Sequence, residues 1–264
     1  MNTERIMLWD GQPPASSPDD GFRPYLELFP APSQEVRGAV LVCPGGGYVN
    51  RAAHEAAPIA EAYRQAGFHA FVVQYRVNPH LHPAPLLDVS RALRIIRHNA
   101  AVWHVDPQRI AVCGFSAGGH LTASLGVHYG LGAINTGDPL DAISARPDAL
   151  ILSYAVISGT YFRHVGSFDN LLGPDPDPKA LALMSLESHV TSDAPPAFLW
   201  HTADDAVVPV ANSLCFAEAL NTHGVPFELH IYPSGPHGLG LAPAAPHVAT
   251  WMGLSIAWLQ GMGW

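Results

Sequence analysis

The sequence predicts an α/β fold, with a mostly parallel central sheet covered by helices on both faces. The chain has 264 residues, of which 48% are hydrophobic and 13% charged, so it can bury a large core and is not expected to be disordered. Short apolar runs alternate with helical patterns along most of its length. Every motif that could carry chemistry follows a predicted strand, and open parallel sheets bind ligands at the carboxyl ends of their strands. Residues 1–264 contain no repeat or linker, which favours a single domain.

The predicted strands are short runs rich in apolar and β-branched residues. The run Ala39–Cys43 is apolar throughout, as expected of a strand buried on both faces. The full set of expected strands is Tyr25–Phe29, Ala39–Cys43, Phe68–Tyr75, Arg109–Cys113, Ala149–Tyr154, Ala197–His201 and Phe227–Tyr232.

Helices are expected between these strands. The clearest begins at Asp88 and places Val89, Ala92, Leu93 and Ile96 on one face. The expected helices are Ala56–Ala66, Asp88–Trp103, Ala117–Tyr129, Val210–His223 and His247–Leu259.

Two segments do not follow the alternation of strands and helices. Residues 1–24, rich in Pro, Ser and Asp from Gln12 to Pro24, are expected to form an N-terminal arm over the surface. Residues 158–192 carry Tyr161, Phe162 and Phe168 and then several prolines. A loop of this length is usually functional or a small excursion. It is interpreted as either a small cap over the pocket or a surface insertion.

Charge and composition exclude several classes of partner. The formal charge of −9 argues against binding to nucleic acid or to an anionic membrane. Three cysteines do not suggest a disulfide framework. Residues Met1–Asp10 do not resemble a signal peptide, and the longest apolar run, near Ala149–Ile157, is too short to cross a bilayer. We therefore expect a cytoplasmic protein, of unknown oligomeric state.

Ser116 is the candidate nucleophile. It lies in a G-x-S-x-G pentapeptide, Gly114 to Gly118, between a predicted strand and a predicted helix. A sharp turn at this place lifts the serine hydroxyl out of the sheet, and small flanking residues allow the turn. The pentapeptide alone is a weak signal, and its position between strand and helix makes it strong.

A glycine-rich loop follows the buried strand that ends at Cys43. Its sequence is Pro-Gly-Gly-Gly-Tyr, residues 44–48, and it lacks the patterns of phosphate-binding loops. Backbone amides of such a loop can approach a substrate oxygen closely and stabilise an oxyanion. We expect the donors to be the N–H groups of Gly46, Gly47 and Ala117.

The general base and its orienting acid are expected in later loops. A weak hydroxyl nucleophile needs an adjacent base, and in this type of fold the order along the chain is Ser, Asp or Glu, then His. His237 follows the last predicted strand and is the favoured base, with His247 as the alternative. Asp205 is favoured over Asp204 as the acid, because it begins an Asp-x-x-Val-Pro spacing.

No cofactor or metal is expected. The chain has 15 histidines, but no H-E-x-x-H pattern or other close ligand cluster is present. His80 and His82 could form a weak metal-binding pair, yet a surface loop is the more ordinary interpretation.

At these motifs the sequence resembles the α/β-hydrolase esterases related to bacterial acetylxylan esterases and feruloyl-esterase-like proteins. The resemblance runs from about Tyr25 to the C-terminus. The residues that carry it include Cys43–Tyr48, His54-Glu55, Tyr75-Arg76, Asp88, Asp106-Pro107, Gly114–Leu121, Trp200–Pro209 and Pro236–Gly238. It implies a triad of Ser116, Asp205 and His237, with Gly46, Gly47 and Ala117 as oxyanion donors.

The expected activity is hydrolysis of short-chain esters, acetyl esters above all, with acetylated sugars as one substrate class. The bulk of Tyr48 and Phe115 beside the two motifs predicts that they bind the substrate in a small acyl pocket, with a core position as the alternative for Phe115. An amidase or aryl-formamidase could use the same triad. A ligand receptor on a hydrolase scaffold is a further alternative, because fold does not fix function.

Overall fold

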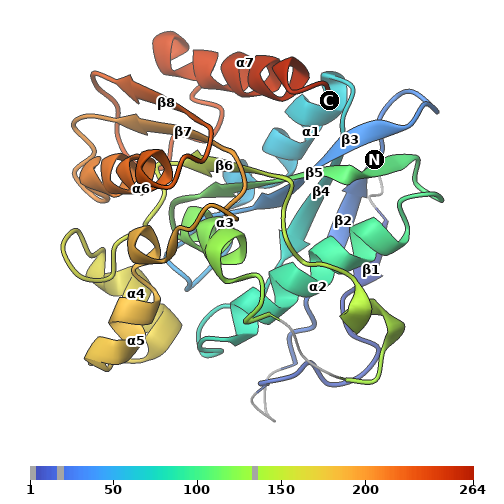
Figure 1. Ribbon diagram of the computed structural model, residues 1–264, viewed down its shortest axis with the longest axis horizontal. Coiled ribbons are helices and arrows are strands. Elements are labelled where there is room, and N and C mark those ends of the chain that lie inside the picture. The colour runs from blue at the N-terminus through green and yellow to red at the C-terminus, as the bar shows by residue number, and fades with distance from the viewer. Residues whose placement is uncertain (1–3, 17–20, 133–135) are drawn as a thin grey trace.

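The computed structural model describes residues 4–16, 21–132 and 136–264 (Figure 1). In this part of the chain, eight strands form one sheet in the order β1-β2-β4-β3-β5-β6-β7-β8. The first two join the sheet antiparallel, and β4, β3, β5, β6, β7 and β8 are parallel neighbours. The strands are β1 (Arg5–Met7), β2 (Tyr25–Phe29), β3 (Arg37–Cys43), β4 (His69–Gln74), β5 (Val105–Phe115), β6 (Ala149–Ser153), β7 (Ala197–Thr202) and β8 (Phe227–Tyr232). The predicted fold class is confirmed.

Helices cover both faces of the sheet (Figure 1). On one face α1 and α7 pack side by side, and on the other lie α2, α3 and α6. The α-helices are α1 (Ala57–Gln65), α2 (Ala84–His98), α3 (Ser116–His128), α4 (Val165–Leu172), α5 (Pro178–Leu183), α6 (Ala211–Thr222) and α7 (Pro246–Gly261). Short 3₁₀ helices are η1 (Ala53–Glu55), η2 (Pro139–Ala142) and η3 (Leu186–His189). None of the helices among the described residues combines the length and apolar character needed to cross a membrane.

The N-terminal segment is more deeply integrated than the expected surface arm. Strand β1 pairs antiparallel with β2, and the Leu8 and Trp9 side chains that follow are buried. Trp9 Nε1 donates to Asp88 Oδ1 at 2.9 Å, and Asp88 in turn forms a buried ion pair with Arg76. Arg76 also donates to the carbonyl of Pro14. These contacts fasten the start of the chain to α2, whereas residues 17–20 of the expected arm lie outside the described residues.

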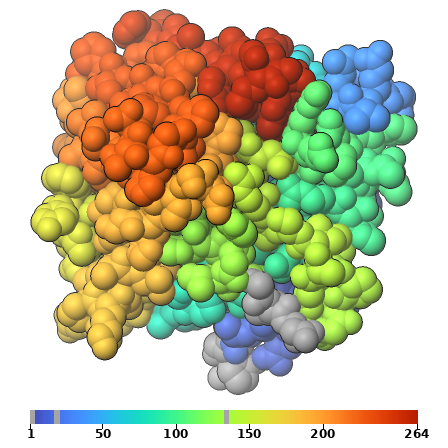
Figure 2. All heavy atoms as spheres, viewed as in Figure 1, coloured from blue at the N-terminus to red at the C-terminus, as the bar shows by residue number. Residues whose placement is uncertain are grey.

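The segment of residues 158–192, here called the cap segment, contains α4, α5 and η3. It lies at the lower left in Figures 1 and 2, in yellow and orange. Three histidines fasten the end of α5: Nε2 of His120, His128 and His189 lies 3.0, 2.9 and 3.0 Å from a backbone carbonyl oxygen of residues 184, 183 and 182, respectively. A carbonyl only accepts, so each Nε2 carries the proton and donates. The last carbonyls of a helix have no partner within it, and these rings supply one.

This arrangement predicts a loss of stability in acid. His120 is buried, and burial lowers the pKa of its imidazole to about 4. Between the ordinary pKa near 6.5 and this value, the unfolded chain binds the proton and the folded protein does not, so stability rises with pH. The contribution of neutral His120 is therefore complete above about pH 6.5 and is lost as pH falls towards 4, by up to about 3 kcal/mol.

Urea unfolding at several pH values between 4 and 7 measures this effect. A His120→Gln variant cannot titrate, so its free energy of unfolding should depend less steeply on pH than that of the wild type. Other histidines with lowered pKa values, such as His128, contribute equally to both proteins and cancel in the difference. Identical pH slopes for the two proteins would show that His120 does not titrate in this way.

Candidate active site

The turn between β5 and α3 carries Ser116. Its backbone has φ of +51°, in the left-handed region that non-glycine residues rarely adopt. Glycine is required on both sides: a Cβ on Gly114 would meet the carbonyl oxygen of Gly118 at 2.2 Å, and one on Gly118 would meet that of Cys43 at 2.2 Å. The sequence therefore folds here into a tight strand-to-helix turn, with the helix starting at Ser116 itself rather than at Ala117.

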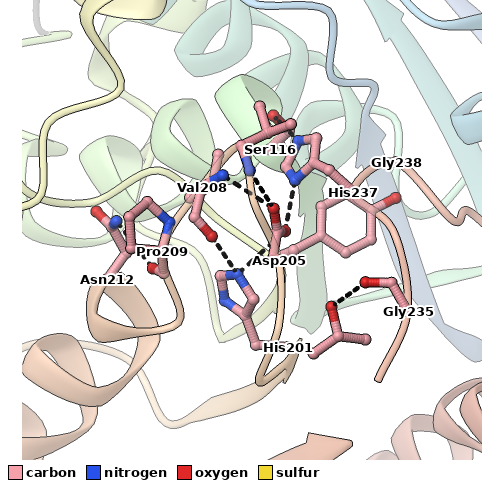
Figure 3. A network of polar contacts seen from close by, with 12 residues as sticks. Ser116, His201, Asp205, Val208, Pro209, Asn212, Gly235, His237 and Gly238 are labelled. Carbon is pink, nitrogen blue, oxygen red and sulfur yellow. Dashed lines mark hydrogen bonds and ion pairs between the residues drawn. The ribbon is translucent and has the colours of Figure 1, made fainter. Parts of the chain in front are cut away.

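Ser116, His237 and Asp205 form one hydrogen-bonded chain across three loops (Figure 3). The carboxylate Oδ2 of Asp205 lies 2.7 Å from His237 Nδ1, and His237 Nε2 lies 2.8 Å from Ser116 Oγ. An ionised carboxylate only accepts, so Nδ1 carries the proton and Nε2 is free to accept from the serine hydroxyl. The structure thus brings together the three residues that the sequence singled out, with the imidazole in the tautomer that a general base needs.

Asp205 is held as an anion. Its Oδ1 accepts from the backbone amides of Val207 and Val208, each at 2.9 Å, and His201 Nε2 lies 3.4 Å from Oδ2. Burial alone would raise the pKa of Asp205, but hydrogen bonds from His201, His237 and these two amides outweigh burial and hold that pKa well below its usual range. Asp205 is therefore ionised at any ordinary working pH.

His201 was not singled out from the sequence. It lies in β7, and it is fully buried between Ser213, which is 2.8 Å from its Nδ1, and the carbonyl of Val208, which is 2.9 Å from its Nε2. In the sequence, His201 is marked only by its position near the end of a predicted strand, four residues before Asp205. Any polar residue near the end of a strand has such a position, so the sequence does not identify His201 as a contact of Asp205.

Asp204 has a different partner from its neighbour. Its Oδ1 accepts from the amide of Gly235 at 2.8 Å, and its side chain is exposed. That contact joins the loop after β7 to the loop after β8, but it does not reach His237. The alternative base His247 lies at the start of α7, where its ring packs against Tyr232 at a centroid distance of 5.3 Å.

The glycine loop runs directly beside the nucleophile. A Cβ on Gly45 would lie 3.1 Å from Ser116 Cβ. Gly46 and Gly47 have φ of +125° and +62°, and a Cβ on Gly46 would meet Asn50 Oδ1 at 2.2 Å, so the turn requires glycine there.

Among the hydrogen bonds of the described chain, none is donated by the amides of Gly46 or Gly47. Ala117 lies in the first turn of α3, where amides have no acceptor within the helix. By contrast, the amide of Gly45 is occupied, because it donates to Glu55 Oε2 at 2.8 Å. The three amides expected as oxyanion donors thus remain available to a ligand.

The cap segment contacts this loop. Asn170 of α4 donates from Nδ2 to the carbonyl of Gly47 at 2.9 Å, and the ring of Phe168 packs edge-on against His120 at 5.2 Å. Tyr48, in the glycine loop, contacts the same histidine. Because Nε2 of His120 donates to the carbonyl of Met184, its Nδ1 carries no proton and accepts from the Tyr48 hydroxyl at 2.9 Å. Part of the cap segment therefore supports the glycine loop, directly through Asn170 and indirectly through His120.

The two aromatic residues expected to bind substrate lie in the interior. Tyr48 is 1% exposed and Phe115 0% exposed. Phe115 packs against Tyr154 and Trp251, each at 5.8 Å between ring centroids. The physical reason is strand alternation, because Phe115 ends β5 with its side chain directed into the core below α1 and α7. Phe115 therefore cannot contact a substrate in this structure, and Tyr48 has a buried partner instead.

The described residues hold no cluster of three or more His, Cys, Asp or Glu side chains suited to a metal. His80 and His82, the pair considered from the sequence, flank Leu81 just before α2.

Comparison with known proteins identifies the family. The BD-FAE family model matches residues 27–220, which include the glycine loop, Ser116 and Asp205. This chain belongs to the BD-FAE family. The match ends before His237, so the third member of the hydrogen-bonded chain rests on the geometry of this structure.

Several solved structures and curated relatives that resemble the chain are named as esterases or ester hydrolases. The crystal structure of an acetyl ester-xyloside bifunctional hydrolase from Caldicellulosiruptor lactoaceticus is 46% identical, with a TM-score of 0.95 over 99% of this chain and 97% of the other. The carboxylesterase Cest-2923 of Lactobacillus plantarum, 28% identical, has a TM-score of 0.80 over 100% of this chain and 98% of that chain. These neighbours confirm the α/β-hydrolase fold and the esterase resemblance expected from the motifs.

Among curated proteins, an endo-1,4-beta-xylanase B of Butyrivibrio fibrisolvens is 41% identical over 84% of this chain, and an acetylxylan esterase of Xylanibacter ruminicola is 34% identical over 85% of it. The chain spans 35% and 44% of the length of these two relatives, respectively. Both relatives are thus longer proteins, and only one part of each matches this chain.

Proposed function

We propose that this chain of the BD-FAE family is a serine carboxylic ester hydrolase that releases short acyl groups, with acetyl favoured. The supporting observation is the hydrogen-bonded chain from Asp205 through His237 to Ser116, next to free backbone amides. Acetylated sugars or xylo-oligosaccharides are the proposed substrate class, because relatives named for acetyl esters and xylosides resemble the chain.

The proposed reaction is acyl transfer in two steps. Ser116 Oγ attacks the ester carbonyl carbon while His237 Nε2 takes the hydroxyl proton, and ionised Asp205 stabilises the imidazolium that forms. The amides of Gly46, Gly47 and Ala117 bind the oxyanion. His237 then gives its proton to the leaving alcohol. In the second step His237 takes a proton from the water that attacks the acyl-enzyme and gives it to Ser116 Oγ as the bond to the acyl carbon breaks and the acid leaves.

Packing near the glycine loop supports a small acyl group. The interior behind this loop is filled by Tyr48, Phe168 and Leu171, each no more than 3% exposed. Val156, which is 0% exposed, packs beside the nucleophile and donates its amide to the carbonyl of Ser116. A long acyl chain entering here would have to displace packed side chains, which is costly.

We expect kcat/KM to be highest for acetyl or propionyl esters and to fall steeply beyond butyryl. Each methylene forced into a filled pocket should cost about 1–3 kcal/mol, or roughly 5- to 150-fold in kcat/KM. A series of p-nitrophenyl esters from acetyl to decanoyl measures this dependence. A maximum at octanoyl would indicate an open groove and would overturn the proposed acyl preference.

Acetylated xylo-oligosaccharides test the alcohol side of the substrate separately. Acetate release from them at a rate comparable to that from p-nitrophenyl acetate would support the carbohydrate assignment. Rapid turnover of the nitrophenyl ester with none of the sugar esters would retain the small acyl pocket and overturn that assignment. Parallel assays of acetanilides and aryl formamides distinguish esterase from amidase activity.

A further inference from the structure

A buried carboxylate lies beneath the glycine loop. Glu55, at the end of η1, is 2% exposed. Its Oε2 accepts from the Gly45 amide at 2.8 Å, and its Oε1 accepts from the Tyr154 hydroxyl at 2.6 Å. A Cβ on Gly45 would meet this Oε2 at 2.5 Å and the carbonyl oxygen of Phe115 at 2.8 Å. The carboxylate, the glycine loop and the residue before Ser116 are therefore in direct contact.

Tyr154 connects the same carboxylate to the loop that carries His237. It directly follows β6 with φ of +36°, a strained backbone that its surroundings must hold in place. Its hydroxyl accepts from the amide of Gly240 at 3.0 Å, and its ring packs edge-on against the His237 ring at 5.0 Å. The carbonyl of Gly240 is held in turn by Trp251 Nε1 at 3.0 Å.

Glu55 and Tyr154 thus form one polar network between the two halves of the site. One end fixes the peptide plane of Gly45, next to the amides of Gly46 and Gly47. The other end fixes the segment just after His237. Both side chains are buried, and a buried polar network with every member paired holds its parts in one arrangement.

We propose that Glu55 and Tyr154 are positioning residues for the ester hydrolysis proposed above: together they set the oxyanion loop and the His237 loop in register with Ser116. Among the described residues, neither side chain forms a hydrogen bond with Ser116 or His237. The proposal rests on the proposed function, since it concerns the rate of that reaction. It adds two residues and a specific route, Gly45–Glu55–Tyr154–Gly240, to the site.

Tyr154→Phe removes the hydroxyl and leaves the ring against His237. We expect kcat for p-nitrophenyl acetate to fall about 10- to 100-fold while KM changes by less than about threefold, because a small displacement of catalytic groups lowers the rate more than it weakens substrate binding. Affinity for 1,1,1-trifluoroacetone, whose carbonyl forms a tetrahedral adduct with the serine, should fall by about the same factor as kcat/KM. A loss of stability alone would not lower kcat and weaken binding of the trifluoroketone while leaving KM nearly unchanged.

Tyr63→Phe is the matched control. Tyr63 is also fully buried, and its hydroxyl contacts Ser255 Oγ at 2.9 Å, between α1 and α7 and away from the site. This variant should be destabilised but should keep kcat within about twofold of the wild type, since a lost buried hydrogen bond affects stability alone at such a place.

Glu55→Gln tests the other end of the network. The glutamine oxygen can still accept from Gly45, but its NH₂ group then faces the Tyr154 hydroxyl, which loses the acceptor for its proton and meets two donors, this NH₂ group and the Gly240 amide. We expect a similar loss of kcat, and the double variant with Tyr154→Phe should lose less than the product of the two single losses, because both remove one shared hydrogen bond.

The outcomes separate this proposal from the proposed function. If the wild type hydrolyses p-nitrophenyl acetate but folded Tyr154→Phe matches Tyr63→Phe in kcat, the positioning role is overturned and the esterase stands. If the wild type hydrolyses no ester, both fail. Strictly multiplicative losses in the double variant would also contradict a single network.

Discussion

Ser116→Ala should lower kcat for p-nitrophenyl acetate by about 10⁴-fold or more, because removing one member of a triad leaves only oxyanion stabilisation and substrate binding. The hydroxyl is the atom that lies 2.8 Å from His237 Nε2, and no other group takes its place in the hydrogen-bonded chain. The Cβ of alanine fits the same backbone, so the variant should fold. Purified variant and wild type are compared in the same ester assay.

Ser124→Ala serves as the control for this variant. Ser124 is a buried serine of the same helix α3, two turns after the nucleophile, and its loss should leave kcat within about twofold. Turnover near the wild-type rate by folded Ser116→Ala, free of contaminating esterase, would refute the proposed mechanism.

The predictable part of this fold is the part that local chemistry determines. The strands from β3 to β8 other than β5 are short and mostly apolar, and β8 begins and ends at the residues expected from the sequence. Strand β5 starts earlier than expected, at Val105, because its first half is polar and its apolar run begins only at Ile110. The nucleophile turn is predictable because glycine is required at positions 114 and 118. A side chain at 114 would collide with the backbone of Gly118, and one at 118 would collide with the backbone where β3 leads into the glycine loop. Helix α2 begins earlier than expected, at Ala84, because proline is tolerated in the first turn of a helix although it looks like a loop residue.

Long-range contacts determine the parts that the sequence did not predict. Strand β1 has three residues without apolar alternation and depends on pairing with β2. The helices of the cap segment are short, and the end of α5 is fastened by histidines from α3 and η3. The burial of Tyr48 depends on His120, which lies 72 positions further along the chain. A sequence motif shows which residues are present, but contacts between residues far apart in the sequence are known only from the folded structure.

The same limit applies to Glu55 and Tyr154. In the sequence, the His54-Glu55 pair is distinguished only by the family resemblance, and Tyr154 is simply the expected end of a strand. The carboxylate and the phenol are 99 positions apart in the sequence, and they meet only because the fold brings the residue after β6 next to η1. Residues that touch the substrate tend to occur in recognisable loops, whereas residues that hold those loops can come from anywhere in the chain.

Asp205→Asn should lower kcat on the order of 10²- to 10⁴-fold, because an amide does not hold the imidazole in the tautomer that accepts the serine proton. In the wild type, the carboxylate Oδ2 accepts from His237 Nδ1 at 2.7 Å while Oδ1 accepts from two backbone amides. An asparagine oxygen can satisfy those two amides, which leaves its NH₂ group facing His237. The ring then offers Nδ1 as acceptor, and its Nε2 carries the proton and cannot take one from Ser116.

Asp204→Asn is the matched comparison, because it makes the same chemical change one residue away. The asparagine oxygen can keep the hydrogen bond from the Gly235 amide, so kcat should stay within about threefold of the wild type. Since hydrogen bonds hold the pKa of Asp205 well below its usual range, the large difference between the two variants should persist from pH 5 to pH 8. Steady-state kinetics of both variants across that range measure the contrast. If the losses were reversed, with Asp204→Asn the slow variant, Asp204 would be the residue that orients His237, and the hydrogen bond between Asp205 and His237 would have to break in the working enzyme.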